Sequence, residues 1–223
     1  MTGGGRPAGV LLDVDGTLVD SNYLHVLAWH RAFRRRGREI PMAIIHRHVG
    51  MGSDQLIQGL LGREDEELSE LHSEEYAPLR DDIRSFDRSG ELLRELKQQG
   101  LRVVLASSAK QDEIPQLVET IGAADAVDEV VSSQAVRSSK PAPDIFKLAL
   151  ERCGLDPERT ICIGDTVWDV EAARRSGLRC LTVCTGGISR GELEAAGAAA
   201  VYADIGELLE RLDTSPIAGL LRS

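Results

Sequence analysis

Two aspartates, Asp13 and Asp15, stand two positions apart directly after the apolar run 10–12. An apolar run that stops at a carboxylate is typical of a buried strand that carries charge at its C-terminal end. In an extended segment, side chains two positions apart point the same way, so both carboxylates would face one place. Like-charged acids repel each other, so the pair requires a cation or a shared proton. The motif therefore predicts a site where a nucleophile, a proton donor and a metal lie together.

Two serines, Ser107 and Ser108, follow a strand predicted over 101–106 and precede a helix predicted over 111–121. A strand end that leads into a helix N-terminus offers free backbone N–H donors to an anion. The alternative for Ser107 is an ordinary N-cap. The segment therefore predicts either an anion site or a helix cap.

A lysine and two aspartates stand in the last part of the chain. Lys140 precedes Pro-Ala-Pro, which holds it on an extended turn outside any regular helix. A solvated loop lysine is the alternative, but only four of the 26 basic residues are lysines. Asp165 and Asp169 follow a strand predicted over 160–163. Asp169 would lie in the first turn of a helix, where the dipole alone favours an acid.

Alternating strands and helices must position these residues. Strand signals lie at 10–12, 101–106, 129–131, 160–163, 179–183 and 199–202, and helical signals in the second half lie at 111–121, 143–153, 167–176 and 205–212. Such alternation implies right-handed crossovers and a mostly parallel sheet, so the predicted fold class is α/β.

Between the first and second strands the pattern changes to consecutive helices, at 23–36, 42–48, 54–61 and 65–76. We interpret this block as a small helical insertion over the C-terminal edge of the sheet, where ligands bind in open α/β folds. The expected domains are a core of residues 1–18 and 89–223 and a cap of residues 19–88. We expect hinges at 18–21 and 85–88, so that the cap can open and close.

Composition narrows the classes of function. The chain has 223 residues, 42% of them hydrophobic, with a net charge of −10, which disfavours nucleic acid or an anionic membrane as a partner. No apolar run is long enough to span a bilayer, and the Gly-rich leader 1–7 does not resemble a signal peptide, so we expect a cytoplasmic protein. The arginine-rich segment 34–38 is interpreted as a solvated helix end. The four cysteines are interpreted as buried reduced thiols.

In order along the chain, the four polar segments resemble the four motifs of the haloacid dehalogenase-like hydrolase superfamily, over about residues 10–212. The resemblance extends to the subgroup with a helical cap between the first two motifs, which includes phosphoglycolate phosphatases and β-phosphoglucomutases. It implies a Rossmann-like three-layer core with the cap inserted after the first strand.

The resemblance also implies roles for the first motif. Asp13 would attack phosphorus and become an aspartyl-phosphate, while Asp15 would protonate the leaving alcohol and then deprotonate the hydrolytic water. Asp165 would bind Mg²⁺ together with Asp13 and the backbone carbonyl of Asp15, since magnesium prefers oxygen ligands.

The remaining implied roles concern the phosphoryl group. Ser107 and the backbone N–H of Ser108 would hold its oxygens, and Lys140 would neutralise both it and the nucleophile. Asp169 would lie just outside the metal ligands and hold a metal-bound water or Lys140. The implied activity is a Mg²⁺-dependent phosphatase for a small phosphorylated metabolite, a sugar phosphate or a phosphoglycolate-like compound, with the protein a monomer or a weak dimer.

Two cap features bear on the alternative, a sugar-phosphate mutase similar to β-phosphoglucomutase. His25 stands at the spacing of a mutase histidine that holds the acid/base aspartate, so this role is open to it. The mutases also carry an arginine for the second phosphate in the loop that corresponds to 49–54, where this chain has none. That absence favours the phosphatase. Gly52, in the same loop, is a candidate for meeting the substrate, although a plain turn would also explain it.

Other activities of the superfamily fit less well. The expected cap has no lysine, so a Schiff base of the phosphonoacetaldehyde hydrolase type is excluded there. Haloacid dehalogenases lack an acid at the position of Asp15, because a leaving halide needs no proton. A binding protein without catalysis is disfavoured because all the motif residues are present.

Overall fold

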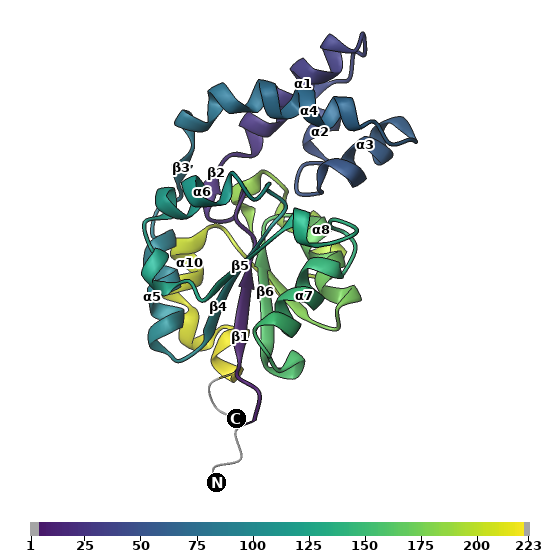
Figure 1. The fold of residues 1–223 in the computed structure, drawn as a ribbon. Coiled ribbons are helices and arrows are strands. Elements are labelled where there is room, and N and C mark those ends of the chain that lie inside the picture. The colour runs from purple at the N-terminus through teal and green to yellow at the C-terminus, as the bar shows by residue number, and fades with distance from the viewer. Residues whose placement is uncertain (1–4, 221–223) are drawn as a thin grey trace.

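The central sheet has the strand order β5-β4-β1-β6-β7-β8, and all its neighbouring strands are parallel (Figure 1). The computed structural model describes residues 5–220, so residues 1–4 of the predicted leader lie outside it. The strands are β1 (Gly9–Leu12), β4 (Arg102–Ser107), β5 (Glu129–Ser132), β6 (Thr160–Gly164), β7 (Arg179–Val183) and β8 (Ala200–Tyr202). The strands β4 and β6 lie on opposite sides of β1, so the direction of the strand order changes at β1. Open α/β sheets bind ligands at the C-terminal ends of the strands where this change occurs.

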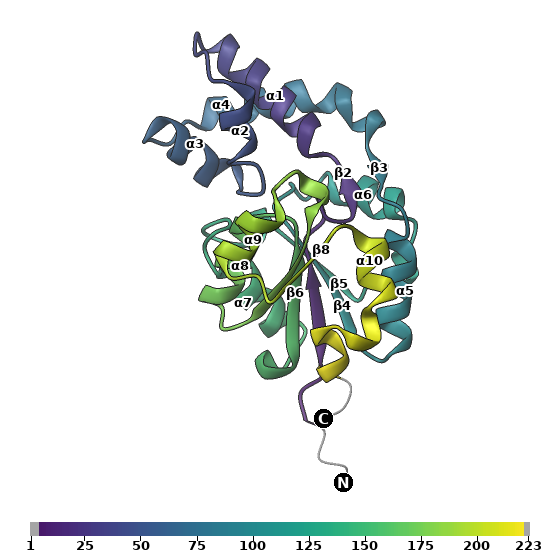
Figure 2. The same cartoon turned by 180° about the vertical axis from the view of Figure 1, so that it is seen from behind.

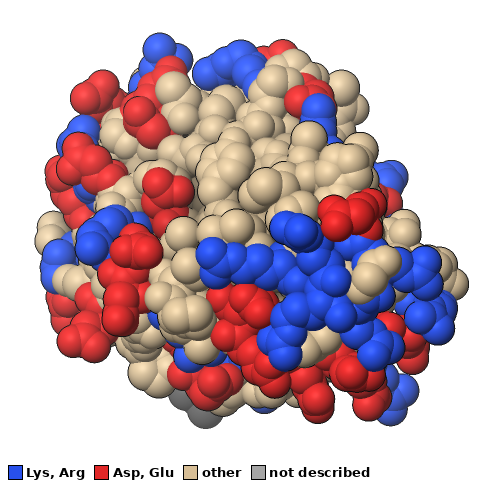
Figure 3. Space-filling view, turned by 90° about the horizontal axis from the view of Figure 1, so that it is seen from above, with Lys and Arg blue, Asp and Glu red and all other residues tan. Residues whose placement is uncertain are grey.

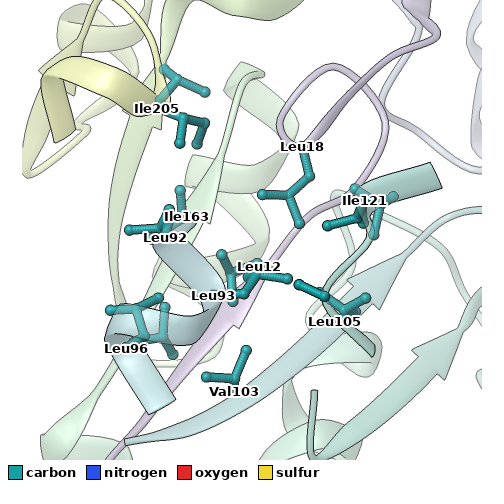
Figure 4. Close-up of a cluster of buried hydrophobic side chains, with 14 of the residues drawn as sticks. Leu12, Leu18, Leu92, Leu93, Leu96, Val103, Leu105, Ile121, Ile163 and Ile205 are labelled. Carbon is teal, nitrogen blue, oxygen red and sulfur yellow. The ribbon is translucent and has the colours of Figure 1, made fainter. Parts of the chain in front are cut away.

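Helices cover both faces of the sheet (Figures 1 and 2). One face carries α5 (Ser89–Gln98), α6 (Ile114–Ile121) and α10 (Ile205–Glu210), and the other carries α7 (Asp144–Arg152) and α8 (Val167–Arg175). Each strand contributes apolar side chains to the packing on both faces of the sheet, because successive side chains point to opposite faces. Leu12 packs in the cluster of Figure 4, whereas its neighbour Leu11 packs in the opposite cluster. The predicted α/β fold with three layers is confirmed.

Four helices stand above the C-terminal ends of the strands (Figures 1 and 2). They are α1 (Asn22–Arg35), α2 (Met42–His46), α3 (Ser53–Leu61) and α4 (Glu66–Tyr76), and a 3₁₀ turn, Ala77–Asp82, follows them. Their inward faces form a separate apolar cluster that includes Phe33, Ile45 and Leu56. The helical cap after the first strand is therefore present, as predicted.

Several local predictions were incomplete. The two crossings between cap and core pair as a short antiparallel ribbon of β2 (Val19–Asp20) and β3 (Arg84–Ser85), where no strand was expected. Two residues are too few to show a period in the sequence. The helices α5 and α9 (Arg190–Ala196) were also not predicted. Finally, α6 begins at Ile114, three residues after the predicted start of this helix at 111, and a turn separates it from Ser107.

Charged side chains of both signs lie side by side on the face seen from above (Figure 3). At the end of α1, Arg35 lies 2.8 Å from Glu74 and Arg36 lies 2.8 Å from Glu67. These arginines are thus paired on the surface, as expected of a solvated helix end. Within residues 5–220, no helix has the length and apolar character needed to cross a membrane. Of the four free cysteines, Cys162 and Cys180 are buried and the other two are partly exposed.

Candidate active site

Asp13 follows β1 and meets a buried lysine from a distant loop. The Lys140 ammonium contacts the Asp13 carboxylate and lies 2.8 Å from Asp169 Oδ1. The lysine side chain has no exposed surface. Burial opposes its charge, but the carboxylates of Asp13 and Asp169 hold the pKa of Lys140 above its usual value. The sequence-predicted lysine is therefore an ion-pair partner inside the protein and not a solvated loop residue.

Three buried carboxylates form a cluster, and two of them, Asp13 and Asp169, contact this lysine. Oxygens of Asp13, Asp165 and Asp169 all lie within 4.8 Å of one another. Burial raises the pKa of Asp13 to about 7, with the charges of Asp169 and Asp15 adding to the shift and Lys140 opposing it. Burial and the charges of Asp13 and Asp169 raise the pKa of Asp165 well above its usual value. Among residues 5–220, only the Lys140 ammonium forms an ion pair with any of the three, so the cluster has room for a further positive charge.

Asp165 follows β6 and is held by two side chains from the first motif and the start of α1. Thr17 Oγ1 donates to its Oδ1 (3.0 Å) and Asn22 Nδ2 donates to its Oδ2 (2.9 Å). A Cβ on Gly16 would lie 2.4 Å from Asp165 Oδ2, and one on Gly186 would lie 1.7 Å from it. Glycine at both positions therefore lets the backbone approach this carboxylate closely.

Asp169 lies at the start of α8. Thr166 Oγ1 donates to its Oδ2 (2.6 Å), and the two residues form a capping box at the helix N-terminus. Its other oxygen faces Lys140. Asp169 therefore lies in the first turn of α8 as a capping acid and also contacts Lys140, which are the two roles that the sequence left open for it.

Asp15 lies between the core and the cap, with donors from both. Ser21 Oγ donates to its Oδ1 (2.6 Å), His25 Nε2 lies 3.4 Å from the same oxygen, and Ser107 Oγ donates to Oδ2 (3.3 Å). Burial alone would raise the pKa of Asp15, but the hydrogen bonds from His25 and Ser21 hold it below its usual value. The carboxylate is thus ionised and held in one orientation.

The loop after β4 approaches both parts of the molecule. Ser107 Oγ accepts from the Ala109 backbone N–H (3.0 Å), which closes a tight turn. Ser108 Oγ donates to the Gly50 carbonyl of the cap (3.3 Å). Ser107 is not a helix cap, because α6 starts several residues later. The turn brings both serines to the same side of the sheet as Asp13.

A chamber lies between this sheet edge and the cap. It is lined by Asp13, Asp15, His25, Trp29, Val49, Gly50, Met51, Gly52, Ser53, Leu56, His72, Ser73, Ser108, Ala109, Lys110 and Glu113. The lining combines the charged groups of the core with an apolar cap surface. A Cβ on Gly52 would lie 2.1 Å from Ser139 Oγ, so this part of the cap loop packs directly on the core. The structure thus brings His25 and Gly52 to the site.

Several lining or supporting residues were missed from sequence. Ser21 and Asn22 bond the site carboxylates, and Lys110 Nζ donates to Ser73 Oγ across the chamber (2.6 Å). The available signal was the polar pair Ser21–Asn22 at the start of the first cap helix, a few residues after Asp13 and Asp15. His72 has no such signal, because α4 brings it to the site from far along the chain.

Several known proteins have sequences similar to this chain. The chain is 29% identical over 215 residues to protein SUPPRESSOR OF QUENCHING 1, chloroplastic, of Arabidopsis thaliana, covering 92% of this chain but only 20% of that protein. The chain thus spans about a fifth of the length of that relative. It is 30% identical over 195 residues to a phosphoglycolate phosphatase of Nitrosococcus oceani, covering 81% of this chain and 85% of that one.

Among solved structures, a hydrolase from Pseudomonas syringae superposes with a TM-score of 0.87 at 33% identity, covering 93% of this chain and 98% of that chain. The family model described as a haloacid dehalogenase-like hydrolase matches residues 7–177. These findings confirm the resemblance seen in the motifs and the predicted enzyme class, a hydrolase of the phosphatase type. The chain belongs to the haloacid dehalogenase-like hydrolase family.

Proposed function

We propose that this protein is a Mg²⁺-dependent phosphatase that hydrolyses a small phosphorylated metabolite through an aspartyl-phosphate on Asp13. The observation that carries the proposal is the buried cluster of Asp13, Asp165 and Asp169, with Lys140 paired to two of its members, beneath the cap chamber. A phosphatase needs a nucleophile, a neutralised phosphoryl group and a proton carrier in one place. This cluster, with Asp15 beside it, supplies each of them.

A divalent cation fits the residues present. Two carboxylates, Asp13 and Asp165, offer hard oxygen ligands and carry charge that the single ammonium of Lys140 leaves uncompensated. The backbone carbonyl of Asp15 is the third proposed ligand. When bound there, Mg²⁺ would neutralise charge on the phosphoryl oxygens and lower the pKa of nearby carboxyl groups. Asp169 would hold Lys140 and the α8 N-terminus in place beside it.

In the first step, an Asp13 carboxylate oxygen bonds to phosphorus while the ester P–O bond breaks. The leaving alkoxide takes a proton from Asp15, which must therefore carry one in the substrate complex. The negative charge of an incoming phosphate would raise the pKa of Asp15 and so favour that protonated state. Lys140 and the loop of Ser107 and Ser108 bind the phosphoryl oxygens during the transfer.

In the second step, Asp15 accepts a proton from a water that attacks the phosphorus of the aspartyl-phosphate. The bond between phosphorus and the Asp13 oxygen breaks, which releases inorganic phosphate and restores the carboxylate. Asp15 leaves this step protonated and exchanges that proton with solvent once phosphate has left, so one residue serves both steps. Its contacts with Ser21 and Ser107 keep it beside Asp13 throughout.

The chamber supports a small substrate. Its cap side is largely apolar, with Trp29, Met51 and Leu56, and Gly52 brings the cap loop against the core. The similarity to a phosphoglycolate phosphatase supports a phosphorylated small metabolite, a sugar phosphate or a phosphoglycolate-like ester. Such a ligand would place its phosphate on the core and its organic part against the cap.

We also propose that the cap, residues 19–88, moves against the core of residues 1–18 and 89–223. The β2–β3 ribbon joins the two crossings, and Phe86 N–H donates to the Leu18 carbonyl (2.9 Å). The expected hinges, 18–21 and 85–88, overlap this ribbon, since the first contains β2 and the second contains the last residue of β3. Closure would remove bulk water from Asp13 before attack, and opening would admit the hydrolytic water and release phosphate.

The test is phosphate release from a panel of phosphate monoesters by the purified protein, with Mg²⁺ and with EDTA. We expect turnover of at least one small ester with Mg²⁺ and loss of that turnover with EDTA. Turnover that continues unchanged in EDTA would contradict the metal assignment. No release from any ester would favour a binding protein without catalysis.

The same panel separates the mutase. With a hexose 1-phosphate as substrate, a mutase would form the 6-phosphate, whereas a phosphatase releases only inorganic phosphate. We expect release alone, because the cap loop 49–54 offers no arginine to a second phosphate. Accumulation of the 6-phosphate would overturn the proposal in favour of the mutase.

A further inference from the structure

Behind His25, on the side away from Asp15, lies a second histidine that the proposed mechanism does not use. His25 Nε2 lies 3.4 Å from Asp15 Oδ1, and His25 Nδ1 lies 3.3 Å from His72 Nε2. The two imidazole planes are inclined by only 19°. The three residues thus form one connected line that starts at the acid/base carboxylate and ends inside the cap.

The protons along this line can be assigned by chemistry. His25 Nε2 faces a carboxylate oxygen of Asp15, so the ring donates to Asp15 from Nε2. With its single N–H on Nε2, His25 accepts at Nδ1, and His72 donates to it from Nε2. His72 is buried, and burial holds its pKa well below 6.5, so it stays neutral at physiological pH.

Aromatic packing holds both rings. The His72 ring stacks on Trp29 with centroids 4.1 Å apart, and the His25 ring stacks on Tyr76 at 3.9 Å. His25 and Trp29 are four residues apart on α1, and His72 and Tyr76 are four apart on α4. Residues at this spacing share a helix face, so the two facing helices interleave their rings.

We propose that His72 is a positioning residue for phosphoryl transfer, whose Nε2–H fixes the tautomer and orientation of His25 and, through it, the Asp15 carboxylate. The inference rests on the proposed role of Asp15 as acid and base. A neutral histidine without a partner at one nitrogen can exchange tautomers, and a fixed donor removes that freedom. Partners one layer behind an active group commonly change activity roughly 10-fold or more when they are removed.

Two substitutions separate positioning from packing. His72→Phe keeps a ring against Trp29 but removes the N–H donor, so we expect kcat to fall roughly 10-fold with KM nearly unchanged. His72→Gln, whose amide N–H can reach the position of Nε2, should recover most of kcat. His30→Phe, a cap histidine whose ring contacts the Ile40 carbonyl, is the matched control and should leave kcat unchanged. Equal kcat for His72→Phe and the wild-type protein would overturn the inference.

A second readout does not depend on turnover. The chain has five histidines, so nitrogen-15 NMR can assign the protonated nitrogen of each ring. We expect His25 to carry its proton on Nε2 in the wild-type protein and to show mixed tautomers in His72→Phe. A wild-type His25 protonated on Nδ1 or on both nitrogens would overturn the inference. If the protein released no phosphate, the proposed function would fail, while the NMR result would still decide whether His72 fixes the His25 tautomer.

Discussion

The core and cap sides of the chamber are held together by different forces. On the core side, Lys140 is buried and contacts Asp13 and Asp169, and oxygens of these two residues and of Asp165 lie within 4.8 Å of one another. On the outer cap side, individual hydrogen bonds and exposed ion pairs join cap and core, such as Trp168 Nε1–H to the Arg47 carbonyl (3.0 Å) and Arg47 with Glu192. Buried charges on strand ends are costly to move, whereas single exposed hydrogen bonds break easily. Under the proposed function, the core therefore carries the chemistry and the cap controls access to the chamber.

Asp13→Asn should have the largest effect on activity and little effect on stability. An amide cannot form the acyl-phosphate, so we expect phosphate release to fall by at least about 1,000-fold. The melting temperature should stay the same or rise, because one of three mutually repelling carboxylates is removed. Asp20→Asn, at an exposed aspartate of β2, is the control and should retain full activity. Near-wild-type release by Asp13→Asn would place the chemistry elsewhere.

Lys140→Met should have the largest effect on stability. It leaves Asp13 and Asp169 buried without their shared ammonium. Removal of one partner from a buried ion pair should lower the free energy of unfolding by about 3–5 kcal/mol. Mg²⁺ should restore part of this loss, because it binds only the folded cluster.

Thermal unfolding of Lys140→Met in EDTA and in Mg²⁺ measures both effects. Lys147→Met, at an exposed lysine of α7, is the matched control and should unfold like the wild-type protein. An unchanged melting temperature for Lys140→Met in EDTA would mean that the three carboxylates do not need a cation.

Gly52→Ala, on the cap side of the chamber, should have an intermediate effect on activity. The new Cβ would lie 2.1 Å from Ser139 Oγ, so the cap loop could not seat on the core. We expect kcat/KM to fall roughly 10-fold, while the melting temperature changes little because the core packing is untouched. Adding Ser139→Gly removes the clashing side chain and should recover most of the activity. If the double variant were no better than Gly52→Ala, the contact between Gly52 and Ser139 would not be the cause.

Single contacts at the outer edge of the cap should have the smallest effects. Trp168→Phe removes the N–H donor to the Arg47 carbonyl, and we expect KM to rise by about two- to five-fold with kcat unchanged. Arg47→Ala removes an exposed ion pair with Glu192 and should change KM by less than about twofold. Steady-state kinetics of both variants measure this order. A large loss of kcat in either variant would show that the edge of the cap shapes the chemistry itself.

Much of the core site could be predicted from sequence because each motif is local. An apolar run followed by Asp13 and Asp15 specifies a strand end, and parallel strands deliver their ends to one edge of the sheet. Asp165 could be placed at the neighbouring strand end in the same way. The role of Lys140 could be predicted only from the resemblance to a family, since a Pro-rich turn does not by itself indicate that its lysine is buried. The structure brings it into contact with Asp13.

The cap side could be predicted only in outline. The four helices follow from their periodicity, but their relative placement depends on packing between residues distant in sequence, such as Trp29 against His72. The β2–β3 ribbon is too short to leave a pattern. Ser21 and Asn22 reach Asp15 and Asp165 only because α1 starts directly above the sheet. Such contacts join residues that are distant in sequence, so no periodicity or spacing in the sequence predicts them.

The most direct test of the central claim is to trap the covalent intermediate. The best ester from the substrate panel, labelled with phosphorus-32, would be mixed with the enzyme and Mg²⁺ and quenched in acid within one turnover. We predict label on the peptide that contains Asp13 in the wild-type protein and none in Asp13→Asn. Rapid phosphate release with no labelled peptide at any quench time, or label retained in Asp13→Asn, would contradict the account.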